Sequence, residues 1–196
     1  MALPEYPVID VEDYLLLDRN SKEKRYEYLD GELRMLAGGS TYHSRIIANL
    51  TGILYSALRG SSCHLYNSDI RLQLSASRYV YPDITVSCDR RDEELSDMIK
   101  YPRLIVEVLS PSTEIIDRIK KFAYYRECPT VQEYMMVDSQ SILLEIYRRE
   151  DDGWKFYTFG PGSTIKLASL DVSFSIDELY EGMNLSGNRD NKNKKG

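Results

Sequence analysis

Residues 103–109 read RLIVEVL, an apolar run of strand length that carries one carboxylate, Glu107, among hydrophobic side chains. A short apolar run of this kind predicts a strand buried in a sheet. Burying a carboxylate is unfavourable unless the charge is paired or bound to a metal. We therefore expect a sheet-containing fold in which Glu107 meets a basic side chain, a metal ion or, at an edge position, water.

The segments around this strand predict an α/β (α+β) domain, a mixed sheet flanked by helices. Strand-like runs on either side of Asp30-Gly31, at 26–29 and 32–36, predict a tight hairpin. Helical spacing predicts helices over 11–17, from Ser40 or Thr41 to about 59, and over 114–127. Further strands are predicted at 70–74, 79–87, 133–137 and 142–147, with a last short hairpin through 154–159. The apolar face predicted for helix 114–127 carries Ile115, Ile116, Ile119, Phe122 and Ala123.

The length of 196 residues suits one domain, which we place at residues 1–185. The remaining stretch, 186–196, contains no apolar residue and is predicted to be a disordered polar tail. No apolar run approaches the roughly 20 residues that span a bilayer. The first ten residues lack the basic and apolar pattern of a signal peptide. These features predict a cytoplasmic protein without a membrane span.

The charge and the cysteines set further limits. The net charge of −6 and the pI of about 5.1 argue against tight non-specific DNA binding, which needs a basic face. They do not exclude a nuclease, because a bound cation offsets an acidic metal site. The three cysteines, Cys63, Cys88 and Cys128, lie far apart and form no zinc-binding motif, so we predict reduced thiols.

A second carboxylate, Asp83, follows Pro82 and precedes the apolar stretch Ile84-Thr85-Val86. By itself, Asp83 is better explained as a turn residue. Two carboxylates on adjacent strands, however, supply the oxygen ligands that Mg²⁺ requires. A cation held by Asp83 and Glu107 would polarise a phosphodiester and lower the pKa of a bound water.

Several segments together resemble the bacterial "putative restriction endonuclease" domain family of the PD-(D/E)xK nuclease superfamily. They are YEYLDGEL (26–33), PDITV (82–86), LIVEVLSPST (104–113), Asp117-Arg118 and 121–125, and the resemblance covers roughly residues 10–150. It implies a restriction-endonuclease-like fold with an N-terminal β-hairpin extension. It further implies an Mg²⁺- or Mn²⁺-dependent endonuclease that hydrolyses DNA, acts as a homodimer and binds its metal through Asp83 and Glu107.

The chain departs from the superfamily pattern at one position. The superfamily lysine normally lies two residues after the glutamate, where this chain has Leu109. The resemblance suggests that Lys121, on the next helix, supplies the missing positive charge and stabilises the charged phosphate. On a helical wheel Lys121 lies near Asp117 and Tyr125 and away from the apolar face. A surface ion pair between Asp117 and Lys121 explains the same spacing.

Three further residues are auxiliary candidates. Glu27 and Glu32 flank the predicted turn, where one of them either adds a metal ligand or orients a water, or both are solvated cross-strand charges. His43, near the start of a helix, is either a base or phosphate contact or an ordinary surface histidine. A non-catalytic binding module on a nuclease-like scaffold is the alternative function, favoured by the acidic charge and by Leu109. Acid–base hydrolysis of a small substrate is a third possibility.

Overall fold

A computed structural model of the chain describes residues 9–21, 24–36, 38–111 and 114–185. In chain order the elements are α1 (Val11–Asn20), β1 (Tyr26–Leu29), β2 (Glu32–Met35), α2 (Thr41–Ala57), β3 (His64–Asn67), β4 (Arg71–Ser75), β5 (Arg78–Val80), β6 (Ile84–Ser87), α3 (Arg90–Glu93), β7 (Met98–Ile99), β8 (Pro102–Leu109), α4 (Glu114–Ile116), the π-helical turn η1 (Asp117–Lys121), α5 (Phe122–Glu127), β9 (Glu133–Asp138), β10 (Leu144–Glu150), β11 (Gly153–Phe159), β12 (Thr164–Leu167), β13 (Val172–Ser175) and α6 (Ile176–Leu179). The tail predicted at 186–196 lies outside the described residues.

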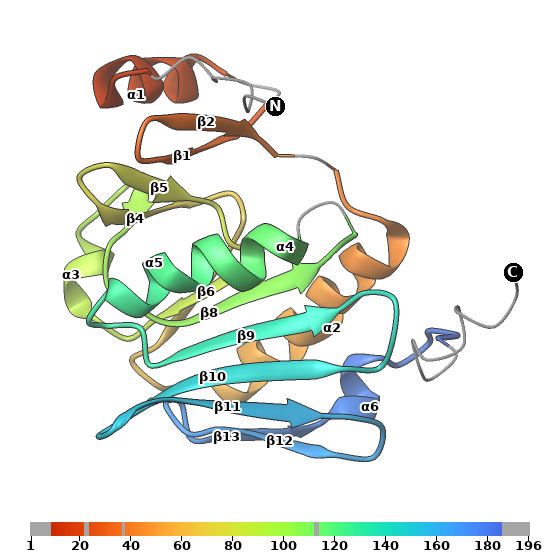
Figure 1. The fold of residues 1–196 in the computed structure, drawn as a ribbon. Helices are drawn as coiled ribbons and strands as arrows, with labels where there is room; N and C mark the ends of the chain where they lie inside the picture. Colours follow the sequence, from red (N-terminus) through yellow and green to blue (C-terminus); the bar gives the residue numbers. More distant parts are fainter. Residues whose placement is uncertain (1–8, 22–23, 37, 112–113, 186–196) are drawn as a thin grey trace, which may run out of the picture.

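A six-stranded mixed sheet in the order β11-β10-β9-β8-β6-β3 forms the centre of the fold. Strand β8 runs parallel to β9 and antiparallel to β6. Figure 1 shows α5 in front of β8 and β9 and α2 behind them. Leu104, Val106 and Val108 join the core shared with α2, whereas Ile105 and Leu109 join the core shared with α5. The predicted mixed sheet with flanking helices is confirmed.

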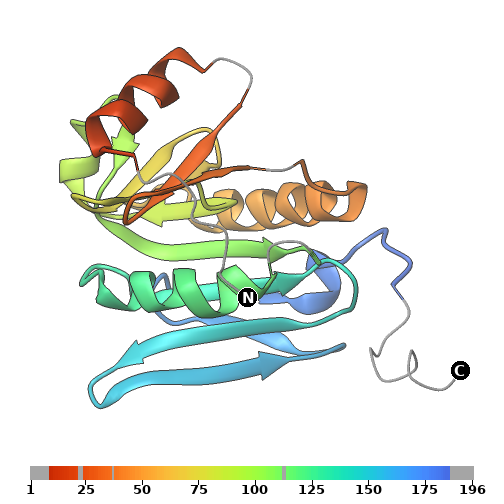
Figure 2. The same ribbon diagram turned by 45° about the horizontal axis from the view of Figure 1, so that its top comes forward.

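The hairpin predicted around Asp30-Gly31 is also confirmed. Both turn residues have positive φ, 53° and 96°, as a tight two-residue link between antiparallel strands requires. Strand β1 then pairs with β5, so the hairpin extends a second sheet in the order β2-β1-β5-β4-β7. Helix α1 lies against this sheet (Figure 2). The contact includes the rings of Tyr14 and Tyr28, whose centroids are 5.0 Å apart.

The single strand predicted over 79–87 is wrong, because this segment forms two strands in different sheets. Strand β5 ends at Val80 and belongs to the five-stranded sheet, and β6 begins at Ile84 in the six-stranded sheet. Pro82, which has no backbone N–H for a strand ladder, lies in the break. The break places Asp83 at the junction of the two sheets.

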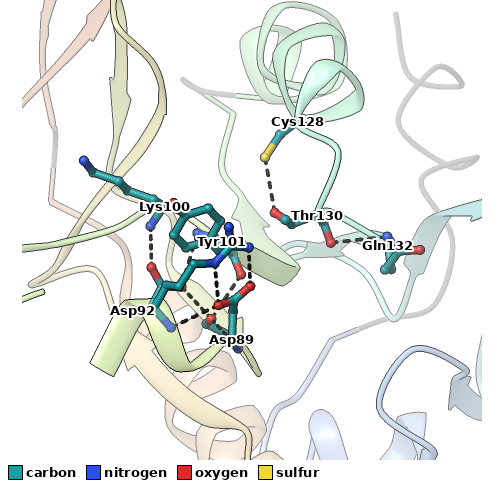
Figure 3. A network of polar contacts seen from close by, with 9 residues as sticks. Asp89, Asp92, Lys100, Tyr101, Cys128, Thr130 and Gln132 are labelled. Carbon is teal, nitrogen blue, oxygen red and sulfur yellow. Dashed lines mark hydrogen bonds and ion pairs between the residues drawn. The ribbon is translucent and has the colours of Figure 1, made fainter. Parts of the chain in front are cut away.

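The charge-rich segment 89–100 is tied to the fold by a buried carboxylate (Figure 3). Asp92 lies in the short helix α3 and is 2% exposed. Its oxygens accept hydrogen bonds from the Ser87 hydroxyl and from the backbone N–H groups of Lys100 and Tyr101, at 2.5, 2.8 and 3.2 Å. These bonds fix the segment against β6 and β8.

Two of the three predicted thiols form a disulfide, so that prediction is wrong for Cys63 and Cys88. Strands β3 and β6 are paired with His64 opposite Ser87. The next residues outward, Cys63 and Cys88, therefore face each other across the sheet, a neighbourhood that their separation of 25 positions does not reveal. Cys128 is a buried thiol, as predicted.

The C-terminal part of the described chain differs from the prediction in one respect. Strand β11 pairs with β10 along its whole length, and a separate hairpin, β12–β13, follows it together with α6. None of the helices in the described part of the chain is both long and apolar enough to cross a membrane.

Candidate active site

Asp83, which directly precedes β6, lies beside Glu107 of β8. Strands β6 and β8 pair with Ile84 opposite Val106, so one further step along the ladder brings Asp83 opposite Glu107. Oδ2 of Asp83 accepts a hydrogen bond of 2.7 Å from the backbone N–H of Val108. Residues opposite each other on antiparallel strands share a face of the sheet, so the two carboxylates point to the same side.

Glu107 is compensated by two hydrogen-bond donors inside the protein. Its carboxyl group is buried, and Oε1 accepts from the hydroxyl of Tyr125 at 2.7 Å and from Nζ of Lys121 at 3.0 Å. Burial raises the pKa of Glu107 well above its ordinary value; Lys121 lowers it, and the neighbouring charges of Asp117, Asp83 and Glu27 raise it further. The Glu107 carboxylate thus lies in a group of negative charges that one lysine offsets only in part.

The helix predicted over 114–127 contains a π-helical turn, η1, between α4 and α5. Asp117, Lys121 and Tyr125 are buried, whereas Ile115 and Ile119 are 75% and 69% exposed. The predicted apolar inward face is therefore wrong at these two isoleucines. The polar side chains point inward because they satisfy Glu107 and one another, and a π-helical turn re-aims side chains within a helix and often marks a functional site.

Lys121 contacts three carboxylates. Its Nζ lies 2.9 Å from Oε1 of Glu27, 3.0 Å from Oε1 of Glu107 and 3.2 Å from Oδ1 of Asp117. Burial by itself lowers the pKa of Lys121, but the three carboxylates outweigh burial, and the net pKa lies well above the ordinary lysine value. Lys121 is therefore a fixed positive charge in the interior, and the interpretation of Asp117–Lys121 as a surface pair is wrong.

The two glutamates of the hairpin have different surroundings. Glu27 is 3% exposed, and its Oε1 accepts a hydrogen bond of 3.2 Å from the backbone N–H of Tyr81. Glu32 is exposed and forms an ion pair with Lys120 at 2.5 Å. Only Glu27 belongs to the buried group around Lys121.

His43 lies in the first turn of α2, whose start is fixed by a cap. The hydroxyl of Ser40 accepts a hydrogen bond from the His43 N–H at 3.2 Å. The ring nitrogen Nε2 lies 3.3 Å from Oδ2 of Asp83. A Cβ on Gly39 would lie only 2.4 Å from Nδ1 of His43, so a larger residue at position 39 would require the ring to shift.

The protonation of His43 depends on this contact. Burial lowers its pKa, but the hydrogen bond and charge of Asp83, the charge of Asp117 and a backbone hydrogen bond to Val108 outweigh burial and raise it above the ordinary value of 6.5. His43 was an auxiliary candidate with an ordinary surface histidine as its alternative. Its placement beside Asp83 removes that alternative.

These side chains meet in a cleft of about 580 Å³ between the two large sheets and α2. Asp83, Glu107, Asp117, Lys121 and His43 all line it. Lys24 and Arg25, which follow α1, add positive charge at the same cleft. Glu27 and Glu32 are not among the described residues that line it.

The side chains at the cleft supply only a small number of ligands for a metal ion. Within the described ranges, no group of three or more His, Cys, Asp or Glu side chains is arranged to hold a metal ion. Mg²⁺ nonetheless binds proteins through one or two carboxylates and takes its other ligands from water and phosphate. The adjacent carboxylates of Asp83 and Glu107, in a cleft open to water and ligand, fit such a cation.

Comparison with known proteins places the chain in a family. The protein family described as "Uma2: Putative restriction endonuclease" matches residues 11–178. The chain belongs to this family. The Uma2 match spans both large sheets and every residue of the cleft described above.

Relatives and a solved structure agree with this assignment. "Uncharacterized protein slr1290" from Synechocystis sp. (strain ATCC 27184 / PCC 6803 / Kazusa) is 38% identical over 180 residues, which cover 91% of this chain and 94% of that protein. "Uncharacterized protein sll1609" from the same strain is 32% identical over 155 residues, 78% of this chain and 87% of the relative. The crystal structure of "a putative nuclease belonging to DUF820" from Anabaena variabilis ATCC 29413 matches with a TM-score of 0.75 at 19% identity, over 88% of this chain and 97% of that one. This match shows the restriction-endonuclease-like fold.

Proposed function

We propose that this Uma2-family protein is a divalent-cation-dependent endonuclease that hydrolyses phosphodiester bonds in DNA. The observation that carries the proposal is the contact between Nζ of Lys121 and Oε1 of Glu107 at 3.0 Å, with Asp83 on the adjacent strand. In this proposal Asp83, Glu107 and the buried ammonium group of Lys121 act as the three charged groups of a PD-(D/E)xK site. Lys121 supplies the positive charge that the superfamily pattern would place at position 109.

Each residue has a defined part in this proposal. Asp83 and Glu107 would hold Mg²⁺ or Mn²⁺, which when bound would supply Lewis-acid polarisation of the phosphodiester and a water of lowered pKa. Lys121, kept charged by its carboxylate partners, stabilises the negative charge that develops on the phosphate oxygens. His43, held against Asp83, presents a ring that contacts a phosphate or carries a proton.

The substrate and its binding follow from the same cleft. Lys24 and Arg25 line it and are suited to contact the phosphates that flank the cleaved bond. A homodimer, in which two such sites cut two strands, and a cytoplasmic location stay predictions from the resemblance and the sequence.

Calorimetric titration with Mg²⁺ and with Mn²⁺ tests the proposal. The wild type is expected to bind the cation, and Asp83→Asn and Glu107→Gln are each expected to abolish binding while the protein stays folded. Glu32→Gln, an acidic residue of the hairpin outside the cleft, is the control that keeps binding. Failure of the wild type to bind either cation, with and without DNA, would instead favour the non-catalytic binding module.

A further inference from the structure

The ammonium group of Lys121 is enclosed by carboxylates from three separate elements. Glu27 comes from β1, Glu107 from β8 and Asp117 from η1, and each lies within 3.2 Å of Nζ. A lysine ammonium has three N–H donors, so the three partners match its donors in number. Of the three carboxylates, only Glu107 has a part in the proposed metal site.

We propose that Glu27 and Asp117 are positioning residues that together hold Lys121 at the reacting phosphate when Glu107 turns to the cation. This inference rests on the proposed nuclease function, because it defines what keeps Lys121 in place once Glu107 is engaged. Neither residue touches the substrate in this role. Both act through the lysine.

Lys121 reaches the cleft from a helix, so contacts with Glu27 and Asp117 are needed to hold its ammonium group in place. A lysine side chain is a flexible four-carbon stem, and its position is set by what its ammonium contacts. Asp117 and Lys121 begin and end the π-helical turn η1, and both point inward while Ile119 between them is 69% exposed. The turn therefore presents the lysine and its first carboxylate partner together on the cleft side.

Glu27 ties the same lysine to the strand segment that carries Asp83. Its Oε1 contacts Nζ of Lys121 at 2.9 Å and accepts from the backbone N–H of Tyr81 at 3.2 Å. Tyr81 lies two residues before Asp83, in the break between β5 and β6. One buried oxygen thus links the position of the lysine to the position of a proposed metal ligand.

A double-mutant cycle tests whether these carboxylates act through Lys121. Asp117→Asn and Glu27→Gln are each expected to lower kcat of Mg²⁺-dependent DNA cleavage by about 10- to 100-fold, the range typical of groups that orient a catalytic ligand, with KM unchanged. In a Lys121→Gln background the same substitutions are expected to cause no further loss, because the lysine through which they act is absent. Equal losses in both backgrounds would overturn the proposal.

Glu32→Gln is the matched control on the same hairpin. Glu32 pairs with Lys120 at an exposed position, so this variant is expected to keep the wild-type kcat. Thermal unfolding of every variant separates loss of kcat from loss of the fold.

A nuclear magnetic resonance measurement keeps the inference independent of activity. In protein with ¹⁵N-labelled lysine, the buried Lys121 ammonium is expected to give a signal that exchanges slowly with water, assigned by its loss in Lys121→Gln. This signal is expected to disappear in Asp117→Asn and Glu27→Gln and to persist in Glu32→Gln. Loss of the signal in a protein that cleaves no DNA would support the anchoring and refute the nuclease, whereas persistence in both variants would refute the anchoring.

Discussion

Nζ of Lys121 lies 3.0 Å from Oε1 of Glu107, although the two residues are 14 positions apart and belong to a helix and a strand. In the superfamily pattern the corresponding lysine lies two residues from the glutamate, on the same strand. Leu109 at that position is buried here in the core under α5. In this structure the lysine beside Glu107 therefore comes from a helix and not from the strand that carries the glutamate.

Replacing Lys121 tests how much its positive charge contributes to the rate of DNA cleavage. Lys121→Gln, which keeps hydrogen-bond donors but removes the charge, is expected to lower kcat of DNA cleavage by about 10²- to 10³-fold, as loss of one transition-state donor does. Lys120→Gln is the control, since Lys120 is the neighbouring lysine and pairs with the exposed Glu32. Equal activity of the Lys121→Gln protein and the wild type in a steady-state cleavage assay would remove Lys121 from the mechanism.

Replacing Glu107 is expected to change how the stability of the protein depends on pH. Because the pKa of Glu107 is raised in the folded protein, its contribution to stability is present below the ordinary value of 4.5 and is lost as the pH rises. Glu107→Gln lacks this loss, so the free energy of unfolding of the metal-free variant is expected to fall less between pH 4 and pH 8 than that of the metal-free wild type. Urea unfolding at both pH values measures the difference, and an equal or larger fall in the variant would contradict the raised pKa of Glu107.

The contact between His43 and Asp83 predicts a second dependence of stability on pH. The raised pKa of His43 means that its charged contact stabilises the fold fully below pH 6.5 and that this stabilisation is lost as the pH rises through the folded-state pKa. His43→Gln is therefore expected to destabilise the metal-free protein more at pH 6 than at pH 9. Titration of the His43 ring signal by nuclear magnetic resonance should show a lower pKa in Asp83→Asn than in the wild type. An unchanged pKa would show that Asp83 does not raise the pKa of His43.

Substitutions at two adjacent glycines, Gly38 and Gly39, form a matched pair that tests what fixes the position of the His43 ring. A Cβ on Gly39 would meet His43 Nδ1 at 2.4 Å, whereas one on Gly38 would meet nothing within 4 Å. Gly39→Ala is expected to displace the ring from Asp83 and to return the pKa of His43 toward its ordinary value, and Gly38→Ala is expected to leave both unchanged. If the two variants give the same ring titration, the close approach at Gly39 does not fix the histidine.

Local patterns in the sequence predicted many of the helices and strands of the fold. The Asp30-Gly31 turn, the Ser40 cap and the apolar run around Glu107 each encode an element through near neighbours, and each is confirmed. The proximity of Asp83 to Glu107 also followed, because Asp83 directly precedes a strand that pairs with the strand of Glu107.

The features that the sequence did not predict depend on contacts between distant segments. The π-helical turn leaves Ile119 exposed because Lys121 is held inward by Glu27 of β1 and Glu107 of β8, and the buried Asp117 contacts Lys121. Helical periodicity reflects the spacing of apolar residues within one segment and contains no information about partners on other segments. The pairing of Cys63 with Cys88 likewise depends on the register of β3 against β6, which no local pattern encodes.

Cleavage of a labelled DNA by wild type and Asp83→Asn, each assayed with Mg²⁺, with Mn²⁺ and with EDTA, tests the central claim most directly. The account predicts cleavage by the wild type in the presence of either cation, none in EDTA, and a loss of at least about 10²-fold in Asp83→Asn. Cleavage that persists in EDTA or that survives the Asp83→Asn substitution undiminished would contradict a cation held by Asp83 and Glu107.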